Sequence, residues 1–296
     1  MSHSHETDST QTFKVGLVLN TAFTIFEMAA GVLTGSLALI ADAAHNLTDT
    51  LTLAIAYIAE RISKRAANER QSYGYGRAKI IASLLNAGIL VCIAAFIGYE
   101  AIQRLGSPTE VPGLTVAAVA SIGIVINGAI AYMLRKQRHN LNAKTAYTNM
   151  LYDTLSSVGA LLAGFAIALF GWEWLDSVVG IGIAVMLLIA TFGIIRDAVH
   201  ILLEGVPRGV SLEAVRKALL KLDHVTDVDD VHAWAIDSDY YAFSCHLVVK
   251  EEQYANSRKT VEAAKAVLEE RFGFHHSTIE VELEDYAKQD HHEQHA

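Results

Sequence analysis

The chain has 296 residues, of which 52% are hydrophobic and only 19% are charged, a balance that argues against a soluble enzyme of this length. Its formal net charge of −9 argues against a nucleic-acid-binding protein, because binding to phosphates requires an excess of basic residues. Two cysteines, Cys92 and Cys245, are too few for a disulfide framework or a cysteine-rich zinc site.

Charge and hydrophobicity are separated along the chain. From Val206 onward there are 10 Lys and Arg residues against 18 Asp and Glu residues, together with 8 of the 13 histidines. The preceding 205 residues are almost neutral, with 13 basic and 14 acidic residues. The acidity therefore belongs to a C-terminal polar domain and the hydrophobicity to the part before it.

Six long stretches with few charges each approach the roughly 20 residues that a helix needs to cross the hydrocarbon core of a membrane. The first contains Asn20 and Glu27 and lacks a basic segment with a small-residue cleavage site, so we expect a retained helix rather than a signal peptide. We predict a disordered tail over residues 1–12 and a transmembrane domain over residues 13–205. Its six spans are approximately Phe13–Leu33, Leu37–Ala59, Ile80–Ile102, Leu114–Leu134, Thr145–Phe170 and Leu175–Leu203.

The basic residues of the short loops predict the orientation, because Lys and Arg near span ends stay on the cytoplasmic side. The alternate loops 34–36, 105–113 and 171–174 contain neither residue. We therefore expect a multi-pass protein of the cell (inner) membrane with both termini in the cytoplasm. The basic residues lie in loops 60–79 and 135–144, and are Arg61, Lys64, Arg65, Arg70, Arg77, Lys79, Arg135, Lys136, Arg138 and Lys144.

The composition changes after Pro207, and residues 206–287 read as a small cytoplasmic α+β domain. Ser211 is a plausible cap for a first amphipathic helix that ends near Leu222. The expected order is α-β-β-α-β, followed by a disordered tail with histidines over residues 288–296. The remaining elements are strands Asp229–Ile236 and Ala242–Val249, helix Ser257–Phe272 and strand Thr278–Leu283.

Ionisable side chains inside the spans indicate a cation path. A carboxylate within a membrane costs several kcal/mol unless it is paired, solvated or bound to a cation. His45 and Asp49 are four residues apart in the second span, and Asn149 and Asp153 repeat this spacing in the fifth, so each pair lies on one helix face. Two such helices would surround a central point with one nitrogen and several oxygens, as suits a four-coordinate divalent cation.

A simpler interpretation is hydrogen bonding between helices, which is the usual role of a single intramembrane Asn such as Asn149. Two carboxylates at matched spacing on separate spans favour the cation site, because Asp49 and Asp153 would repel each other unless a cation or a proton neutralised them. Asp42, three residues before His45, is assigned to the access path.

Several motifs together resemble the cation diffusion facilitator family of zinc-type metal exporters over nearly the whole chain. In the first part they are GSLALIADAAHNLTD (35–49), YGYGRAK (73–79), NLNAK (140–144) and DTLSSVG (153–159). In the last part they are LEGVP (203–207), VHAW (231–234) and HSTIE (276–280). The six-span layout and the α-β-β-α-β domain are also those of the family.

The resemblance implies a homodimeric antiporter that moves Zn²⁺ or a similar divalent ion out of the cytoplasm in exchange for protons. The family's transport ligands map onto His45, Asp49 and Asp153, and onto Asn149 by position, where zinc-type members usually have a histidine. An amide oxygen is a harder and weaker ligand than imidazole, so the site could also admit Mn²⁺, Co²⁺ or Fe²⁺. Cd²⁺ is a further candidate substrate. The imidazole of His45 favours Zn²⁺, which we therefore expect to be the main substrate.

The resemblance also places regulatory zinc sites in the C-terminal domain, at His232, His246, His276 and Glu282. The ordinary alternative is that these are partly exposed strand side chains without a ligand. Arg77 and Glu204 match positions that form a charge link in the family, although Arg77 also satisfies the positive-inside rule.

Two other classes of function fit the sequence less well. A membrane-anchored metal sensor that does not transport would not need the matched polar pairs of the second and fifth spans. A metalloenzyme is disfavoured, because the sequence has neither an activated nucleophile nor an HExxH-like motif. We therefore expect a transporter with no enzymatic activity, no organic cofactor and no nucleic-acid partner.

Overall fold

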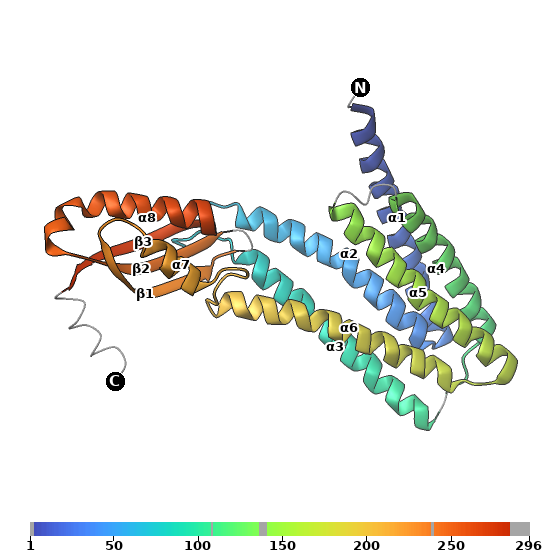
Figure 1. Cartoon of the computed structure of the whole chain (residues 1–296). Helices are drawn as coiled ribbons and strands as arrows, with labels where there is room; N and C mark the ends of the chain where they lie inside the picture. The colour runs from blue at the N-terminus through green and yellow to red at the C-terminus, as the bar shows by residue number, and fades with distance from the viewer. Residues whose placement is uncertain (1–2, 108, 136–140, 238–239, 285–296) are drawn as a thin grey trace. The chain divides into compact units, whose positions relative to one another are not determined.

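A computed structural model of the chain describes residues 3–107, 109–135, 141–237 and 240–284, with side chains described except at residues 3–17, 49, 50, 53, 141–146 and 149. Six long helices come first, and a small α+β domain follows them (Figure 1). The long helices are α1 (His3–Thr34), α2 (Leu37–Ser63), α3 (Ala78–Gly106), α4 (Gly113–Leu134), α5 (Leu141–Phe170) and α6 (Trp174–Leu202).

Four helices are long and apolar enough to cross a membrane when only the described residues are considered. They are α3, α4, α6 and the Met150–Phe170 part of α5. The described apolar part of α1 is shorter, Val18–Thr34, and α2 is not among the four. Large apolar side chains such as Leu33, Leu169 and Ile189 are exposed on these helices, as expected for surfaces that face lipid.

Helix α1 begins at His3, within the stretch that the sequence analysis assigned to a disordered tail. Residues 3–12 contain neither Gly nor Pro, so nothing in the backbone ends the helix before the apolar part begins. The tail 288–296 and the end of the predicted domain after residue 284 lie outside the described residues.

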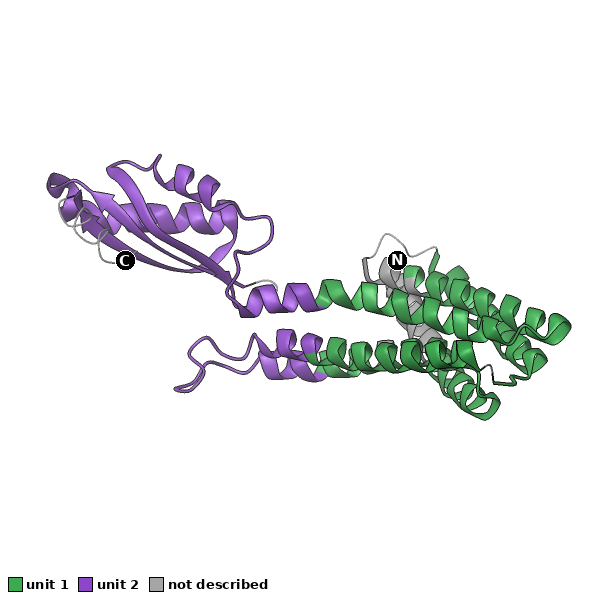
Figure 2. Ribbon diagram, turned by 90° about the horizontal axis from the view of Figure 1, so that it is seen from below, with its two compact units in different colours: residues 1–57, 85–194 green, residues 58–84, 195–296 purple. Residues whose placement is uncertain are grey.

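The chain divides into two compact units, coloured separately in Figure 2. Unit 1 comprises residues 1–57 and 85–194, which hold most of the long helices. Unit 2 comprises residues 58–84 and 195–296, which hold the ends of α2, α3 and α6 and the whole α+β domain.

Helix α2 is the central helix of unit 1. Ala41 and Ala44 pack with apolar side chains of α3 and α6, including Ile97 and Leu187. Other positions of α2 pack against α4 and α5, as in the cluster of Ala38, Ala120 and Ala160. The α2 side of these contacts consists of small side chains, Ala38, Ala41 and Ala44.

Helices α4 and α5 approach each other through two glycines. A Cβ atom on Gly164 would lie 2.7 Å from the backbone nitrogen of Ala117, and one on Gly113 would lie 2.5 Å from the carbonyl oxygen of Gly164. Both distances are shorter than any real contact, so glycine is required at each position. This packing fixes α5, which carries Asp153, against α4.

The α+β domain has the predicted α-β-β-α-β order. Its elements are α7 (Leu212–Leu219), β1 (Val225–Ala235), β2 (Tyr241–Val249), a short 3-10 helix (Glu251–Asn256), α8 (Ser257–Phe272) and β3 (Phe274–Leu283). Strand β2 is central, antiparallel to β1 and parallel to β3.

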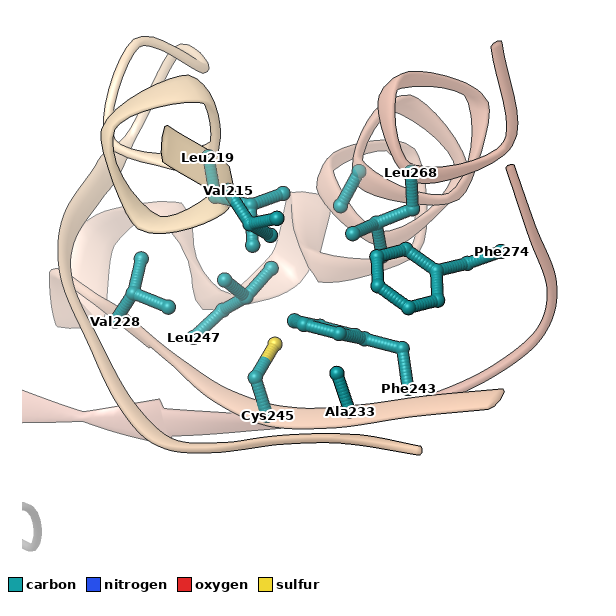
Figure 3. Close-up of a cluster of buried hydrophobic side chains, with 10 residues drawn as sticks. Val215, Leu219, Val228, Ala233, Phe243, Cys245, Leu247, Leu268 and Phe274 are labelled. Carbon is teal, nitrogen blue, oxygen red and sulfur yellow. The ribbon is translucent and has the colours of Figure 1, made fainter. Parts of the chain in front are cut away.

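One face of this sheet forms the domain's core with α7 and α8 (Figure 3). Val215 and Leu219 of α7 and Leu268 of α8 point toward Phe243 and Leu247 of β2, and all five side chains are fully buried. Burying each such side chain stabilises the fold by about 1.5–3 kcal/mol. Ser211 caps α7 as predicted, accepting a hydrogen bond from the backbone N–H of Ala214.

Candidate functional site

The fifth and second long helices bring together two of the predicted metal ligands. Nε2 of His45, on α2, lies 3.7 Å from Oδ1 of Asp153, on α5. Asp153 is 1% exposed, whereas the His45 side chain keeps 21% of its surface exposed. Nδ1 of His45 has no hydrogen-bond partner among the described residues. An imidazole and a carboxylate are thus adjacent inside an apolar helical unit.

Asp49 and Asn149 lie on the same two helices, one turn from His45 and Asp153 respectively. Their side chains are outside the described ones, so the predicted ligand set is half described. Among the described residues, no three His, Cys, Asp or Glu side chains lie close enough together to hold a metal ion. The four-ligand site therefore stays a prediction.

Asp42 is held by two serines that the sequence analysis did not single out. The hydroxyl of Ser156 donates to Oδ1 of Asp42, and the hydroxyl of Ser157 donates to Oδ2 at 3.2 Å. Both serines belong to α5 and follow Asp153 by three and four residues. Asp42 is 1% exposed, so these bonds replace the water that a buried carboxylate would otherwise need.

Glu27 extends this polar interior to α1. It is completely buried, and its carboxylate lies beside Asp42 and the amide of Asn46, with the charge of Asp153 also within electrostatic reach. Two adjacent carboxylates in an apolar environment are too costly to remain charged without a proton or a cation. The signal in the sequence was a glutamate in the first span, but its neighbours depend on how the helices pack.

A second group of ligand-type side chains lies in unit 2, on the face of the sheet opposite α7 and α8. Nδ1 of His246 lies 2.7 Å from Oε1 of Glu282, and its Nε2 lies 3.6 Å from Oδ2 of Asp230. Nε2 of His232 lies 2.8 Å from Oδ1 of Asp230. The structure therefore brings together His232, His246 and Glu282, as expected, and adds Asp230.

Asp230 was not predictable from the pattern, because β1 bulges between Asp229 and His232 and Asp230 takes a positive φ of 49°. His276, the fourth residue expected here, is elsewhere on the sheet. It pairs in register with Ala242, four residues before His246, and its ring makes an edge contact with Tyr73 at 5.6 Å. No contact with His232 or His246 is described for it.

The predicted charge link is present within unit 2. Nη2 of Arg77 lies 3.2 Å from Oε1 of Glu204, and the two side chains are 37% and 65% exposed. A cavity of about 550 Å³ is lined by both residues together with Tyr73, His232 and Trp234. Nζ of Lys79 lies 2.9 Å from Glu60 and 3.6 Å from Asp237. The Arg77–Glu204 pair ties the segment between α2 and α3 to the end of α6, and the Lys79–Asp237 pair ties the start of α3 to the α+β domain.

Comparison with known proteins identifies the class to which this arrangement belongs. Residues 13–203 match the family model described as the cation efflux transmembrane domain, and residues 207–284 match the cation efflux protein, cytoplasmic domain. The chain belongs to the cation efflux, or cation diffusion facilitator, family, and it is an integral membrane protein with a helical membrane domain and a small cytoplasmic domain.

Three relatives show how the family's proteins are named. A cadmium, cobalt and zinc/H(+)-K(+) antiporter of Bacillus subtilis is 33% identical over 289 residues, covering 96% of this chain and 93% of its own. The metal cation efflux system protein CzcD of Cupriavidus metallidurans is 38% identical over 283 residues, covering 95% and 89%. The zinc transporter ZitB of Pectobacterium atrosepticum is 32% identical over 288 residues, covering 96% and 89%.

Proposed function

We propose that this protein exports divalent transition-metal cations from the cytoplasm in exchange for protons, with Zn²⁺ as its first substrate. The observation that carries the proposal is the adjacency of His45 and Asp153, 3.7 Å apart, within the helical unit of a cation efflux family member. The relatives' names, which include cadmium, cobalt and zinc as well as protons, support the same class of substrate.

The proposed substrate site consists of His45 and Asp49 from α2 and Asn149 and Asp153 from α5. One imidazole and two carboxylates suit Zn²⁺, and the amide of Asn149 supplies a harder oxygen that also suits Co²⁺, Mn²⁺ or Fe²⁺. Cd²⁺ is a further proposed substrate, because a relative's name includes cadmium. Asp42, held by Ser156 and Ser157, lies on the proposed access path.

Proton exchange follows from the chemistry of these ligands. A ligand must lose its proton before it binds a metal ion, so entry of the metal releases protons and entry of protons expels the metal. Because an imidazole binds a metal ion only in its neutral form, we assign His45 as one proton carrier. A carboxylate of the same site can carry another.

We further propose that all six long helices span the membrane, within a transport domain of residues 13–205, with both termini in the cytoplasm. The basic residues of loops 60–79 and 135–144 support this orientation. The cytoplasmic domain, residues 206–287, is proposed to form a homodimer.

The second proposed metal site belongs to that domain and is regulatory. His232, His246 and Glu282 supply imidazole and carboxylate groups of the kind that bind zinc, and Asp230 adjoins them. Within the described part of one chain these groups do not form a three-ligand set. We propose that a second copy of the domain completes the site, so that metal binding draws the two domains together by neutralising their negative charge.

The test of the function is zinc flux in proteoliposomes of the full-length chain under an imposed pH gradient. We expect zinc to move when the gradient is present and flux to fall when an ionophore collapses it. Zinc binding without flux would support the membrane-anchored sensor instead, and zinc flux indifferent to the gradient would remove the proton from the proposal.

A further inference from the structure

The start of α2 is capped by a carboxylate that belongs to another helix. Asp176, in the first turn of α6, accepts hydrogen bonds from the hydroxyl of Ser36 at 2.5 Å, from the backbone N–H of Leu37 at 2.6 Å and from that of Ala38 at 3.3 Å. Asp176 is 2% exposed and Ser36 is completely buried. The bonds are therefore made away from water, where an unpaired carboxylate would be costly.

This arrangement accounts for the unpaired N–H groups with which every helix begins. The N–H of Leu39 donates to the hydroxyl of Ser36 at 3.3 Å, so Ser36 caps its own helix once and Asp176 caps it twice. A negative charge at a helix N-terminus is also favoured by the helix dipole. A single serine at this position could cap α2 locally; the carboxylate adds a connection to α6.

Two further contacts hold the same end of α2. Nη1 of Arg104, near the end of α3, donates to the carbonyl oxygen of Gly35 at 2.6 Å, while its Nε donates to Glu100 at 2.9 Å. Gly35 has a φ of 69°, a left-handed conformation that glycine adopts without strain. Gly180, one turn after Asp176, lies so close that a Cβ atom there would be 3.2 Å from Cβ of Leu37.

These hydrogen bonds are directional, so they fix both the rotation and the axial position of α2 at its start. His45 follows Leu37 by eight residues, which is about 12 Å along a helix. A helix transmits a rotation at its end to that distance, so a looser start would move His45 relative to Asp153 on α5. The 3.7 Å separation of His45 and Asp153 depends on that rotation.

We propose that Asp176 is a positioning residue for transport: by capping α2 from α6 it holds the metal ligands of α2 in register with Asp153. The inference rests on the proposed function, because it concerns the geometry of the proposed substrate site. Asp176 touches neither His45 nor Asp153 in any described contact, so its effect passes through the position of the helix.

The experiment separates positioning from simple capping. Asp176→Ala removes both, whereas the double variant Ser36→Asp with Asp176→Ala supplies a strong N-cap on α2 itself without the connection to α6. Asp197→Ala, which removes an exposed carboxylate further along α6, is the matched control. For each full-length variant, the melting temperature in detergent and the KM and maximal rate of zinc flux in proteoliposomes are measured.

We expect Asp176→Ala to lower the melting temperature and to raise the KM for zinc by about tenfold, with a maximal rate within about twofold of wild type. The double variant should recover the melting temperature and keep the high KM, and Asp197→Ala should match wild type. Recovery of both quantities in the double variant, or an unchanged KM in Asp176→Ala, would overturn the proposal.

If Asp176→Ala does not fold, Asp176→Asn decides: it keeps the shape of the side chain, but its NH2 group cannot accept the hydrogen bonds that one of the two carboxylate oxygens now accepts. A raised KM in that variant supports positioning, and a wild-type KM refutes it. Absence of zinc flux in the wild-type protein would refute the proposed function itself. Normal wild-type flux with an unaltered KM in the variants would refute only the positioning role of Asp176.

Discussion

The close approach of α4 and α5 predicts that substitution of Gly164 destabilises the protein. In Gly164→Ala, the new methyl group would lie 2.7 Å from the backbone nitrogen of Ala117 and 2.8 Å from the carbonyl oxygen of Gly113. Both neighbours are backbone atoms, which cannot rotate away, so the two helices must separate by several tenths of an ångström. Overpacking of this kind costs about 1–3 kcal/mol.

Gly159→Ala is the matched control on the same helix, because no atom of the described residues, apart from its own stretch of helix, lies within 4 Å of the position that its Cβ would occupy. Alanine is favoured over glycine inside a helix by about 1 kcal/mol, so this variant should be as stable as wild type or slightly more so. At about 2 °C per kcal/mol for a large domain, we expect Gly164→Ala to melt about 2–6 °C below wild type.

The assay is thermal unfolding of both purified full-length variants in the same detergent, followed by zinc flux in proteoliposomes. Because α5 carries Asp153, we also expect flux to fall more in Gly164→Ala than in Gly159→Ala. Equal melting temperatures for the two variants would refute the close packing of α4 on α5.

Three further predictions concern other parts of the chain. Asn149→His should shift competitive flux toward Zn²⁺ over Mn²⁺, because imidazole suits zinc better than an amide oxygen does, and unchanged metal ratios would count against Asn149 as a ligand. A double-mutant cycle of Arg77→Ala and Glu204→Ala, measured by urea unfolding, should give a coupling free energy of only about 0.2–1 kcal/mol that decreases with added salt, because both side chains are more than a third exposed. A larger coupling that does not depend on salt would contradict a surface ion pair. Burial raises the pKa of the Cys245 thiol to about 12, aided by the charge of Asp230. The thiol of the unfolded chain loses its proton from about pH 8.5, whereas the buried thiol keeps it. The free energy of unfolding is therefore unaffected below that pH and falls as pH rises toward 12, by about 2 kcal/mol at pH 10. Cys245→Ala should lack this alkaline loss of stability, and an equal loss in both proteins would refute the assignment.

The sequence predicted the elements well where local pattern decides them. Apart from the start of α1, which lies at His3 rather than Phe13, the apolar stretches located the long helices within a few residues of their observed ends. Helix α8, from Ser257 to Phe272, has the predicted bounds. The pattern predicts the start of β1 at Asp229, because the residues before it, including Thr226 and Asp227, lack a clear alternation. The strand begins earlier, at Val225. Its pairing with β2 supplies the hydrogen bonds that local propensity does not reveal.

The site was predictable only as far as helical spacing reaches. The i, i+4 pattern identified His45 and Asp153, which the structure places 3.7 Å apart. The serines that hold Asp42 lie more than 110 residues away in sequence, and the bulge that presents Asp230 depends on strand register. Such contacts come from tertiary packing, as does the separation of His276 from His246, so no pattern in one segment could have shown them.

We propose above that His45, Asp49, Asn149 and Asp153 form the path of a metal ion exchanged for protons. The most direct test is zinc-driven proton flux in sealed vesicles containing wild-type protein, Asp49→Ala or Asp153→Ala, with exposed Glu110→Ala as the control. We expect flux in wild type and in the control and none in either site variant, at equal amounts of folded protein. Proton flux retained in both Asp49→Ala and Asp153→Ala would contradict the proposed site.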